Sequence, residues 1–191
     1  MKIFGCCFVG PPLRDLSFQE DTPACLRLKE ALLRETVYLI EVHRVRCFLT
    51  GMALGVDQWA AEAVLELKGL YPDLQLHAAL PCADQAARWS AARQRRYEAI
   101  LAHCDQTVTL RERYTAACMQ ARNQYMIEHS RFVLAVWDGQ PGNTQETVAY
   151  ALQEGLQVLL LHPDQPPAPE ACSSYKAARP RGSASSLDTR C

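Results

Sequence analysis

The stretch Thr50-Gly51-Met52-Ala53-Leu54-Gly55-Val56-Asp57 follows an apolar run and opens an alanine-rich segment that favours a helix. Two glycines followed by an acid are typical of a strand-to-helix turn that binds phosphate or ribose. Glycine lets backbone N–H groups approach a ligand closely, and a helix start adds unpaired N–H donors and the positive end of a dipole. The stretch therefore predicts a ligand-binding loop after a buried strand.

A second turn of the same kind, Asp138-Gly139-Gln140-Pro141-Gly142-Asn143-Thr144, follows the apolar run at 132–137. Glycine amides and the Thr144 hydroxyl could hold a phosphate here. Two plainer interpretations stay open, since Asp138-Gly139 also suits an ordinary turn and Thr144 an ordinary helix N-cap. We predict that the loops at 51–57 and 138–144 form opposite walls of one site.

Apolar runs alternate with helical patterns along the chain. We expect strands at 3–9, 45–50, 74–80, 107–110, 132–137 and 158–161, and helices at 22–42, 56–68, 84–103, 115–130 and 144–154. This order predicts an α/β fold, a Rossmann-like three-layer α/β/α sandwich with a mostly parallel sheet. Ligands of such folds bind at the carboxyl ends of the strands, where we also expect Gly10 and Pro81.

The bulk composition fits a globular domain with a tail. The 191 residues are 49% hydrophobic and 21% charged, which is ordinary for a globular protein. We expect one ligand-binding domain at 1–164. Residues 165–191 are rich in Pro, Ser, Ala and Arg, with little to bury, so they predict a disordered tail.

The charge of the chain and its cysteines indicate which kinds of partner the protein binds and in which cell compartment it lies. A net charge of -1 gives no electrostatic case for nucleic acid or an anionic membrane. No apolar stretch approaches the roughly 20 residues that span a bilayer, and no signal peptide follows Met1. The 9 cysteines lack zinc-binding spacing, so no metal is expected. Reduced core cysteines predict a cytoplasmic protein.

Two stripes at helical spacing carry candidate side chains. Met119, Arg122, Asn123 and Met126 share one helix face. An inward arginine needs an acid or a ligand phosphate as partner, and we favour the phosphate. For Asp57, a favourable position in the first helical turn and a contact with a ribose hydroxyl stay equally open.

The second stripe is Trp89, Arg93 and Tyr97. Its aromatic side chains favour core packing over a base-stacking platform. The neighbouring Arg88, Arg95 and Arg96 are expected on a solvated face.

Four segments together resemble a known family. Gly51-Met-Ala-Leu-Gly-Val-Asp-Gln-Trp-Ala-Ala-Glu62, Pro81…Gln85…Trp89…Tyr97, Arg122-Asn-Gln-Tyr-Met126 and Asp138-Gly-x-x-Gly-x-Thr144 are similar, in that order, to the YpsA family. That family belongs to the SLOG superfamily, with the DNA-processing protein DprA and the LOG phosphoribohydrolases. The resemblance covers about residues 3–162.

The resemblance implies a Rossmann-like domain that binds a nucleotide or a nucleotide-derived, ADP-ribose-like ligand. It implies no known reaction and no certain cofactor, and it suggests a sensor or regulator in bacterial stress or cell-division control. A protein partner or a second copy of the chain stays open. The implied ligand contacts are Gly10, Gly51, Gly55, Asp57, Gln85, Trp89, Arg122, Asn123, Asp138, Gly139, Gly142 and Thr144.

The chain departs from the YpsA pattern at two turns. The family has G-H-R-P after its first strand, where this chain has Gly10-Pro11-Pro12-Leu13. It also has Asn143 where a glycine usually precedes the threonine. The absent histidine and arginine would be ligand contacts, so the ligand or its affinity is expected to differ, or binding to be lost.

Two other function classes stay open. LOG enzymes carry M-x-x-R-K and P-G-G-x-G-T-x-x-E, whose lysine and glutamate are Asn123 and Thr147 here. The nearest acid, Glu146, would point about 100° away on the helix, which argues against N-glycosidic hydrolysis and for a non-enzymatic domain. DprA-like binding of single-stranded DNA is the third class, and the near-neutral charge counts against it.

Overall fold

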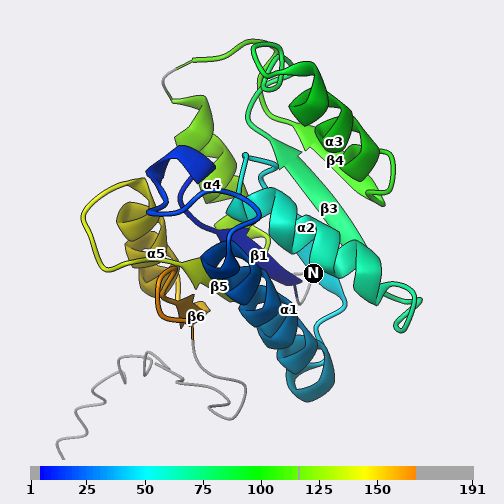
Figure 1. The fold of residues 1–191 in the computed structure, drawn as a ribbon, viewed down its shortest axis with the longest axis vertical. Coiled ribbons are helices and arrows are strands. Elements are labelled where there is room, and N and C mark those ends of the chain that lie inside the picture. Colours follow the sequence, from blue (N-terminus) through cyan, green and yellow to red (C-terminus); the bar gives the residue numbers. More distant parts are fainter. Residues whose placement is uncertain (1–4, 116, 167–191) are drawn as a thin grey trace, which may run out of the picture.

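Six strands form one sheet in the computed structural model, which describes residues 5–115 and 117–166. The strands are β1 Gly5–Val9, β2 Cys47–Thr50, β3 Gln75–Leu80, β4 Gln106–Thr109, β5 Phe132–Val136 and β6 Gln157–Leu161. They lie in the order β4-β3-β2-β1-β5-β6, and every neighbouring pair is parallel (Figure 1). The chain runs outward from β1 to β4 and then returns to β5 on the other side of β1. The loops after β1 and β5 therefore diverge, which is where parallel sheets bind ligands.

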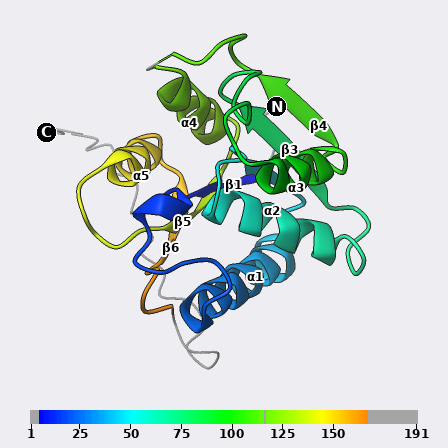
Figure 2. The same ribbon diagram turned by 45° about the horizontal axis from the view of Figure 1, so that its top comes forward.

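Helices cover both faces of this sheet (Figure 2). Helices α1 Pro23–His43, α2 Val56–Leu67 and α3 Ala91–Leu101 share one apolar cluster, and α4 Cys118–Glu128 and α5 Asn143–Gln153 share the other. Alternate residues of β1 pack into the two clusters, because successive side chains of a strand point to opposite faces. Phe8 belongs to the cluster with α1, α2 and α3, and Cys7 to the cluster with α4 and α5. The predicted Rossmann-like α/β/α fold is confirmed.

Most predicted elements match, with one large shift at α3. The Thr22 side chain accepts a hydrogen bond from the Cys25 N–H at 3.3 Å, so the predicted N-cap of α1 is confirmed. Asp84, in contrast, does not begin a helix. Its Oδ1 accepts the Tyr114 N–H at 3.0 Å, which ties the loop after β3 to the loop after β4. Helix α3 begins only at Ala91, after Ser90.

Other sequence predictions concern the membrane, the cysteines and the tail. Within the described ranges no helix is long and apolar enough to cross a membrane. Seven described cysteines are free, six of them buried. No group of three metal-binding side chains occurs among the residues that the structure describes. The predicted tail lies, from residue 167 on, outside the described residues.

Candidate ligand-binding crevice at the carboxyl edge of the sheet

A cavity of 360 Å³ opens between the loop after β1 and the loop after β5. Its lining comes from residues 10–17 without Leu13, from residues 137–144 without Gly139, and from residues 163–164. All three segments follow strand ends. The volume lies within the range of small-molecule sites. This crevice is the position at which open parallel sheets bind their ligands.

The N-terminus of α5 borders the crevice. Gly142 precedes the helix with a φ of 152°, and no described atom lies within 4 Å of the place where its Cβ would be. The first hydrogen bond of the helix runs from the Glu146 N–H to the Gly142 carbonyl at 3.0 Å. The three preceding N–H groups, of Asn143, Thr144 and Gln145, therefore have no partner among the described residues. Together with the helix dipole they favour an anion.

Thr144 lies in the first turn of α5 and is not its N-cap. The N-cap position belongs to Gly142, which offers no side-chain cap. The plain N-cap interpretation of Thr144 is therefore wrong. Thr144 itself lines the crevice.

The crevice carries more negative than positive charge. Asp15, Asp138 and Asp164 line it, and Arg14 is the cation among its described lining residues. Arg14 Nε lies 3.5 Å from the carboxylate of Asp15, which already neutralises part of its charge. Carboxylates accept hydrogen bonds, so they suit ligand hydroxyls better than several phosphates.

The loop after β5 holds its own shape. Asp138 Oδ1 accepts the Gln140 N–H at 2.9 Å, and the Trp137 indole N–H donates to the Gln140 carbonyl at 2.7 Å. Gly139 lies between them with a φ of 85°, a conformation that glycine adopts at little cost. The turn predicted at Asp138-Gly139 is therefore present.

The loop at 51–57 does not face the loop at 138–144. Strand β1 lies between β2 and β5, so the loop after β1 separates them. That loop packs directly on the 51–57 loop, since Pro12 pairs with Gly55 and the Leu13 N–H donates to the Leu54 carbonyl at 3.0 Å. The prediction of opposite walls is corrected by this strand order.

The two glycines of the first motif make room for the protein's own atoms. A Cβ on Gly51 would lie 1.8 Å from Arg122 Nη1, and one on Gly55 would lie 2.9 Å from the Leu13 nitrogen. Gly55 also has a φ of 97°. A Cβ on Gly10 would lie 2.7 Å from the Val56 side chain. Packing accounts for all three glycines, and a ligand contact at Gly51 or Gly55 stays a prediction.

Asp57 and Arg122 bind each other. Each is only 5% exposed. Arg122 Nη1 donates to the Gly51 carbonyl at 2.6 Å and lies 3.3 Å from Asp57 Oδ2. Burial raises the pKa of the Asp57 carboxyl, an effect that the Arg122 charge and the Ala53 N–H partly offset. Of the two partners that the sequence left open for Arg122, the acid is present, and ligand contacts by this pair stay a prediction.

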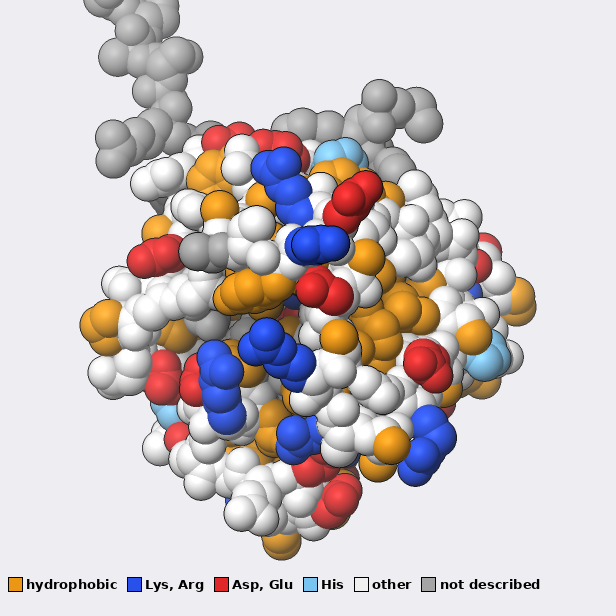
Figure 3. Space-filling model, turned by 90° about the horizontal axis from the view of Figure 1, so that it is seen from above, with side chains coloured by type: hydrophobic (Ala, Val, Ile, Leu, Met, Phe, Trp, Pro, Cys, Tyr) orange, Lys and Arg blue, Asp and Glu red, His pale blue; other side chains and the backbone are white. Residues whose placement is uncertain are grey.

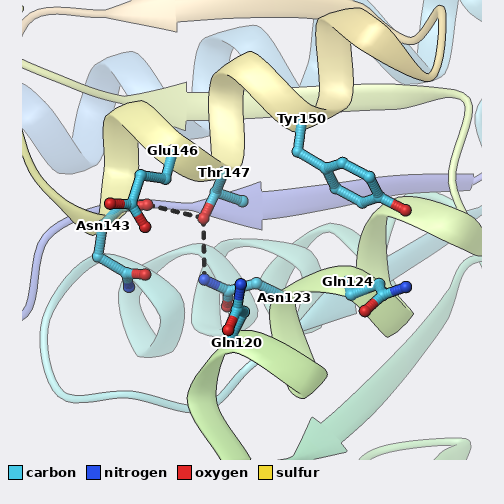
Figure 4. A pocket seen from close by; sticks show the side chains of 7 residues that line it. All are labelled: Gln120, Asn123, Gln124, Asn143, Glu146, Thr147 and Tyr150. Atoms are coloured by element: carbon cyan, nitrogen blue, oxygen red, sulfur yellow. Dashed lines mark hydrogen bonds between the residues drawn. The ribbon is translucent and has the colours of Figure 1, made fainter. Parts of the chain in front are cut away.

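A chain of hydrogen bonds connects this ion pair with the first residue of α5. Arg122 Nε donates to Asn123 Oδ1 at 2.8 Å, and Asn123 Nδ2 donates to Thr147 Oγ1 at 2.9 Å. The Thr147 hydroxyl in turn donates to the Asn143 carbonyl at 2.8 Å (Figure 4). In the sequence, Thr147 stands out only as the residue at the position of the LOG glutamate. Its spacing of four residues from Asn143 within a helix was the signal for this bond.

A second cavity, of 210 Å³, lies between α4 and α5. Its seven lining side chains all carry polar groups and come from α4 and α5 alone (Figure 4). Glu146 is one of them, together with Thr147. Glu146 and Thr147 are consecutive in α5 and so point about 100° apart, as helix geometry predicts, and the cavity borders both positions.

Gln85 and Trp89 lie between β3 and α3, and β3 is separated by β2 from the strands that carry the crevice loops. Gln85 Nε2 donates to the Gly51 carbonyl at 3.1 Å, and the Tyr97 hydroxyl donates to Gln85 Oε1 at 3.4 Å. Trp89 meets Tyr97 edge-on, with ring centroids 5.4 Å apart, against the core. The structure agrees with core packing for these two aromatic side chains, although Trp89 precedes α3 and Arg93 is exposed. Neither Gln85 nor Trp89 lines the crevice, so their ligand contacts stay a prediction.

Arg96 differs from the solvated arginine that the sequence predicted. Its guanidinium pairs with both Glu62 oxygens at 2.6 Å and with Glu20 at 2.5 Å. Burial opposes ionisation of Glu20, but hydrogen bonds from Arg96 and Trp59 and the charges of Arg96 and Lys29 hold the pKa of Glu20 below its usual value. Arg88 and Arg95 are exposed, as predicted.

The face that carries the loops after β3 and β4 shows no stripe of one charge. Figure 3 looks onto this side, and its Lys and Arg side chains lie among Asp and Glu side chains. A backbone-tracking groove for single-stranded nucleic acid needs a continuous positive surface. The face in view does not present one.

Solved structures of DNA processing protein A share the fold. The protein from Streptococcus pneumoniae superposes with a TM-score of 0.59 at 18% identity, over 84% of this chain and 50% of that chain. The Helicobacter pylori protein, studied for its single-stranded DNA binding mode, gives 0.55 at 19% identity, over 84% and 66%. The chain thus spans half of the first protein and 66% of the second, and the likeness concerns the fold alone.

Sequence relatives are closer. The uncharacterized SPbeta prophage-derived protein YoqJ of Bacillus subtilis (strain 168) is 35% identical over 156 residues, which cover 74% of this chain and 91% of YoqJ. A UPF0398 protein of Bacillus cereus is 33% identical over 141 residues, which cover 72% and 76%. The YpsA model, described as the YspA SLOG family, matches residues 11–165. The chain belongs to this family.

Proposed function

We propose that this chain is a nucleotide-binding domain whose ligand, a nucleotide or a nucleotide-derived molecule, occupies the crevice between the loops after β1 and β5. We further propose that it acts as a sensor or regulator, in bacterial stress or cell-division control as the family resemblance implies, and not as an enzyme. Family membership supports the ligand class. The observation that carries the proposal is the N-terminus of α5, with three unpartnered N–H groups, at a crevice of 360 Å³.

The ligand's phosphate would accept hydrogen bonds from the first turn of α5, including the Asn143 and Thr144 N–H groups. The dipole of the helix adds to this attraction. Ribose hydroxyls would donate to the carboxylates of Asp138 and Asp164. The excess of acids in the crevice favours a ligand with one or two phosphate charges over a triphosphate, because each further charge would be repelled.

The test is a thermal-shift screen of the full chain with AMP, ATP, ADP-ribose, NAD and cyclic nucleotides. A ligand at a hundredfold excess over its Kd stabilises the folded state by about 2.7 kcal/mol. For a chain of this size that raises Tm by about 5–10 °C. We expect AMP or ADP-ribose to give such a shift, and ATP to give a smaller one.

Gly142→Asp should abolish the shift, because its carboxylate would occupy the phosphate position. Gly142→Ala is the matched control: it imposes the same cost at a φ of 152° without adding charge, so binding should persist. Equal affinity in Gly142→Asp and Gly142→Ala would refute this site. The absence of a shift with every ligand would refute the proposed function and favour a scaffold that binds protein partners.

A nucleotide-processing activity is the second candidate, and the position of Glu146 favours it. This carboxylate shares the α4–α5 cavity with Asn123 and Thr147, where a general acid or base could reach a bound nucleotide. Nucleoside monophosphates and NAD should then be cleaved at the base–ribose bond during incubation with pure protein. Intact substrates by chromatography would reject this activity.

A further inference from the structure

We infer that the cavity between α4 and α5 is a separate subsite, which reads the base of the bound nucleotide and selects bases that carry an exocyclic amino group. The inference rests on the proposed function, since it requires a ligand held at the N-terminus of α5. It goes beyond it by assigning a second cavity and a class of base. It depends on the position, the rigidity and the hydrogen-bonding capacity of the cavity.

The position is set by Asn143, which lines both the 360 Å³ crevice and the 210 Å³ cavity. The two spaces therefore meet at the first residue of α5. A phosphate held by the N–H groups of that residue and the next would lie at this junction. The rest of the ligand could then extend along α5 towards the gap between the helices (Figure 4).

The back of the cavity is held rigid. Asn123 accepts from Arg122 and donates to Thr147, and Thr147 donates to the Asn143 carbonyl. Each of these groups thus has a fixed direction, and Arg122 is itself fixed by Asp57. A cavity with an ordered wall loses little conformational entropy when it binds.

Three side chains supply the selectivity. Gln120, Asn143 and Glu146 line the gap (Figure 4), and none of them has a side-chain hydrogen bond to another described residue. A carboxamide both donates and accepts, whereas a carboxylate only accepts. The edge of adenine or cytosine, with an amino donor beside a ring-nitrogen acceptor, complements this set. An oxo group in place of the amino group would face the Glu146 carboxylate and be repelled.

The experiment measures the affinity of the full chain by titration calorimetry for ribose 5-phosphate and for two pairs of nucleotides, AMP with IMP and CMP with UMP. We expect ribose 5-phosphate to bind, and at least one amino nucleotide to bind about tenfold tighter than its oxo counterpart. Glu146→Gln should remove this preference, because an amide can also donate to an oxo group. It should not weaken the binding of ribose 5-phosphate, because it removes a negative charge from the first turn of α5.

Glu154→Gln is the matched control. It makes the same charge change at the exposed C-terminal end of α5, and it should leave the preference intact. If ribose 5-phosphate binds but neither pair is discriminated, the inference is overturned while the proposed function stands. If Glu154→Gln also removes the preference, a general charge effect explains it and the inference fails. If neither ribose 5-phosphate nor any nucleotide binds, the proposed function fails, and the inference falls with it.

Discussion

Arg122→Met tests whether the buried ion pair supports the fold. The substitution keeps much of the apolar stem and removes the guanidinium, whose Nη1 contacts the Gly51 carbonyl at 2.6 Å and Asp57 Oδ2 at 3.3 Å. The Asp57 carboxylate, 5% exposed, would keep only the Ala53 N–H at 3.2 Å. Removal of one partner of a buried ion pair costs about 3–5 kcal/mol. We expect a loss of that size in the free energy of unfolding, which is a large part of a typical total of about 5–15 kcal/mol.

The pH dependence of this loss follows from the Asp57 carboxyl. Burial raises its pKa above the ordinary value of 3.8, and Arg122 opposes that rise, so the variant should raise the pKa further. The folded state then binds the proton more tightly than the unfolded state does. The stability of the variant therefore falls as pH rises from about 3.8 through the folded-state pKa. Its deficit relative to the wild type should be largest at neutral pH and smaller near pH 5.

Urea unfolding followed by circular dichroism at the two pH values measures both effects. Adding Asp57→Asn to Arg122→Met should restore at least about 1 kcal/mol, because a buried amide costs less than an unpaired carboxylate. A loss below about 1 kcal/mol in the single variant, or no recovery in the double variant, would refute the structural role.

Two further predictions concern a loop and an acid. Gly55→Ala should lower the free energy of unfolding by about 1–3 kcal/mol, because φ is 97° and the new Cβ would lie 2.9 Å from the Leu13 nitrogen. Gly69→Ala is the control and should change the urea midpoint little, because its nearest contact is at 3.4 Å and its φ is not positive. Equal urea midpoints for the two variants would contradict this prediction. Glu20, whose pKa is lowered from 4.5, stabilises the fold above that pH and loses the effect as pH falls through its folded-state pKa. Glu20→Gln should therefore flatten the decline of stability between about pH 5 and about pH 3, and an unchanged slope in urea titrations would show that Glu20 contributes nothing there.

The sequence predicted the layers of the fold well because they depend on local patterns. Periods of two and of 3.6 residues distinguish strands from helices, and Thr22-Pro23 marks the start of α1 by its own chemistry. The start of α3 was misjudged because Asp84 is an equally good cap. Its side chain is instead used by the Tyr114 N–H, 30 positions away, and nothing local indicates that partner.

The site was harder to predict because it depends on strand order. Two glycine-rich turns suggest two walls, but only the order β2-β1-β5 shows that the loop after β1 lies between them. Likewise, a glycine that makes room for a ligand looks the same in sequence as one that makes room for a side chain. At Gly51 that side chain is Arg122, 71 positions away. The unpartnered start of α5, in contrast, was predictable from Gly142 and the helical pattern that follows.

The two motifs remain connected in the structure, though not as facing walls. Asp57 holds Arg122, which fixes Asn123, which fixes Thr147 and through it the Asn143 carbonyl. Asn143 is the residue at which the crevice and the α4–α5 cavity meet. A disturbance at the first motif would therefore reach the ligand through the orientation of α5. This predicts that Arg122→Met weakens nucleotide binding even where the protein stays folded, so a loss of affinity in that variant does not require contact between Arg122 and phosphate.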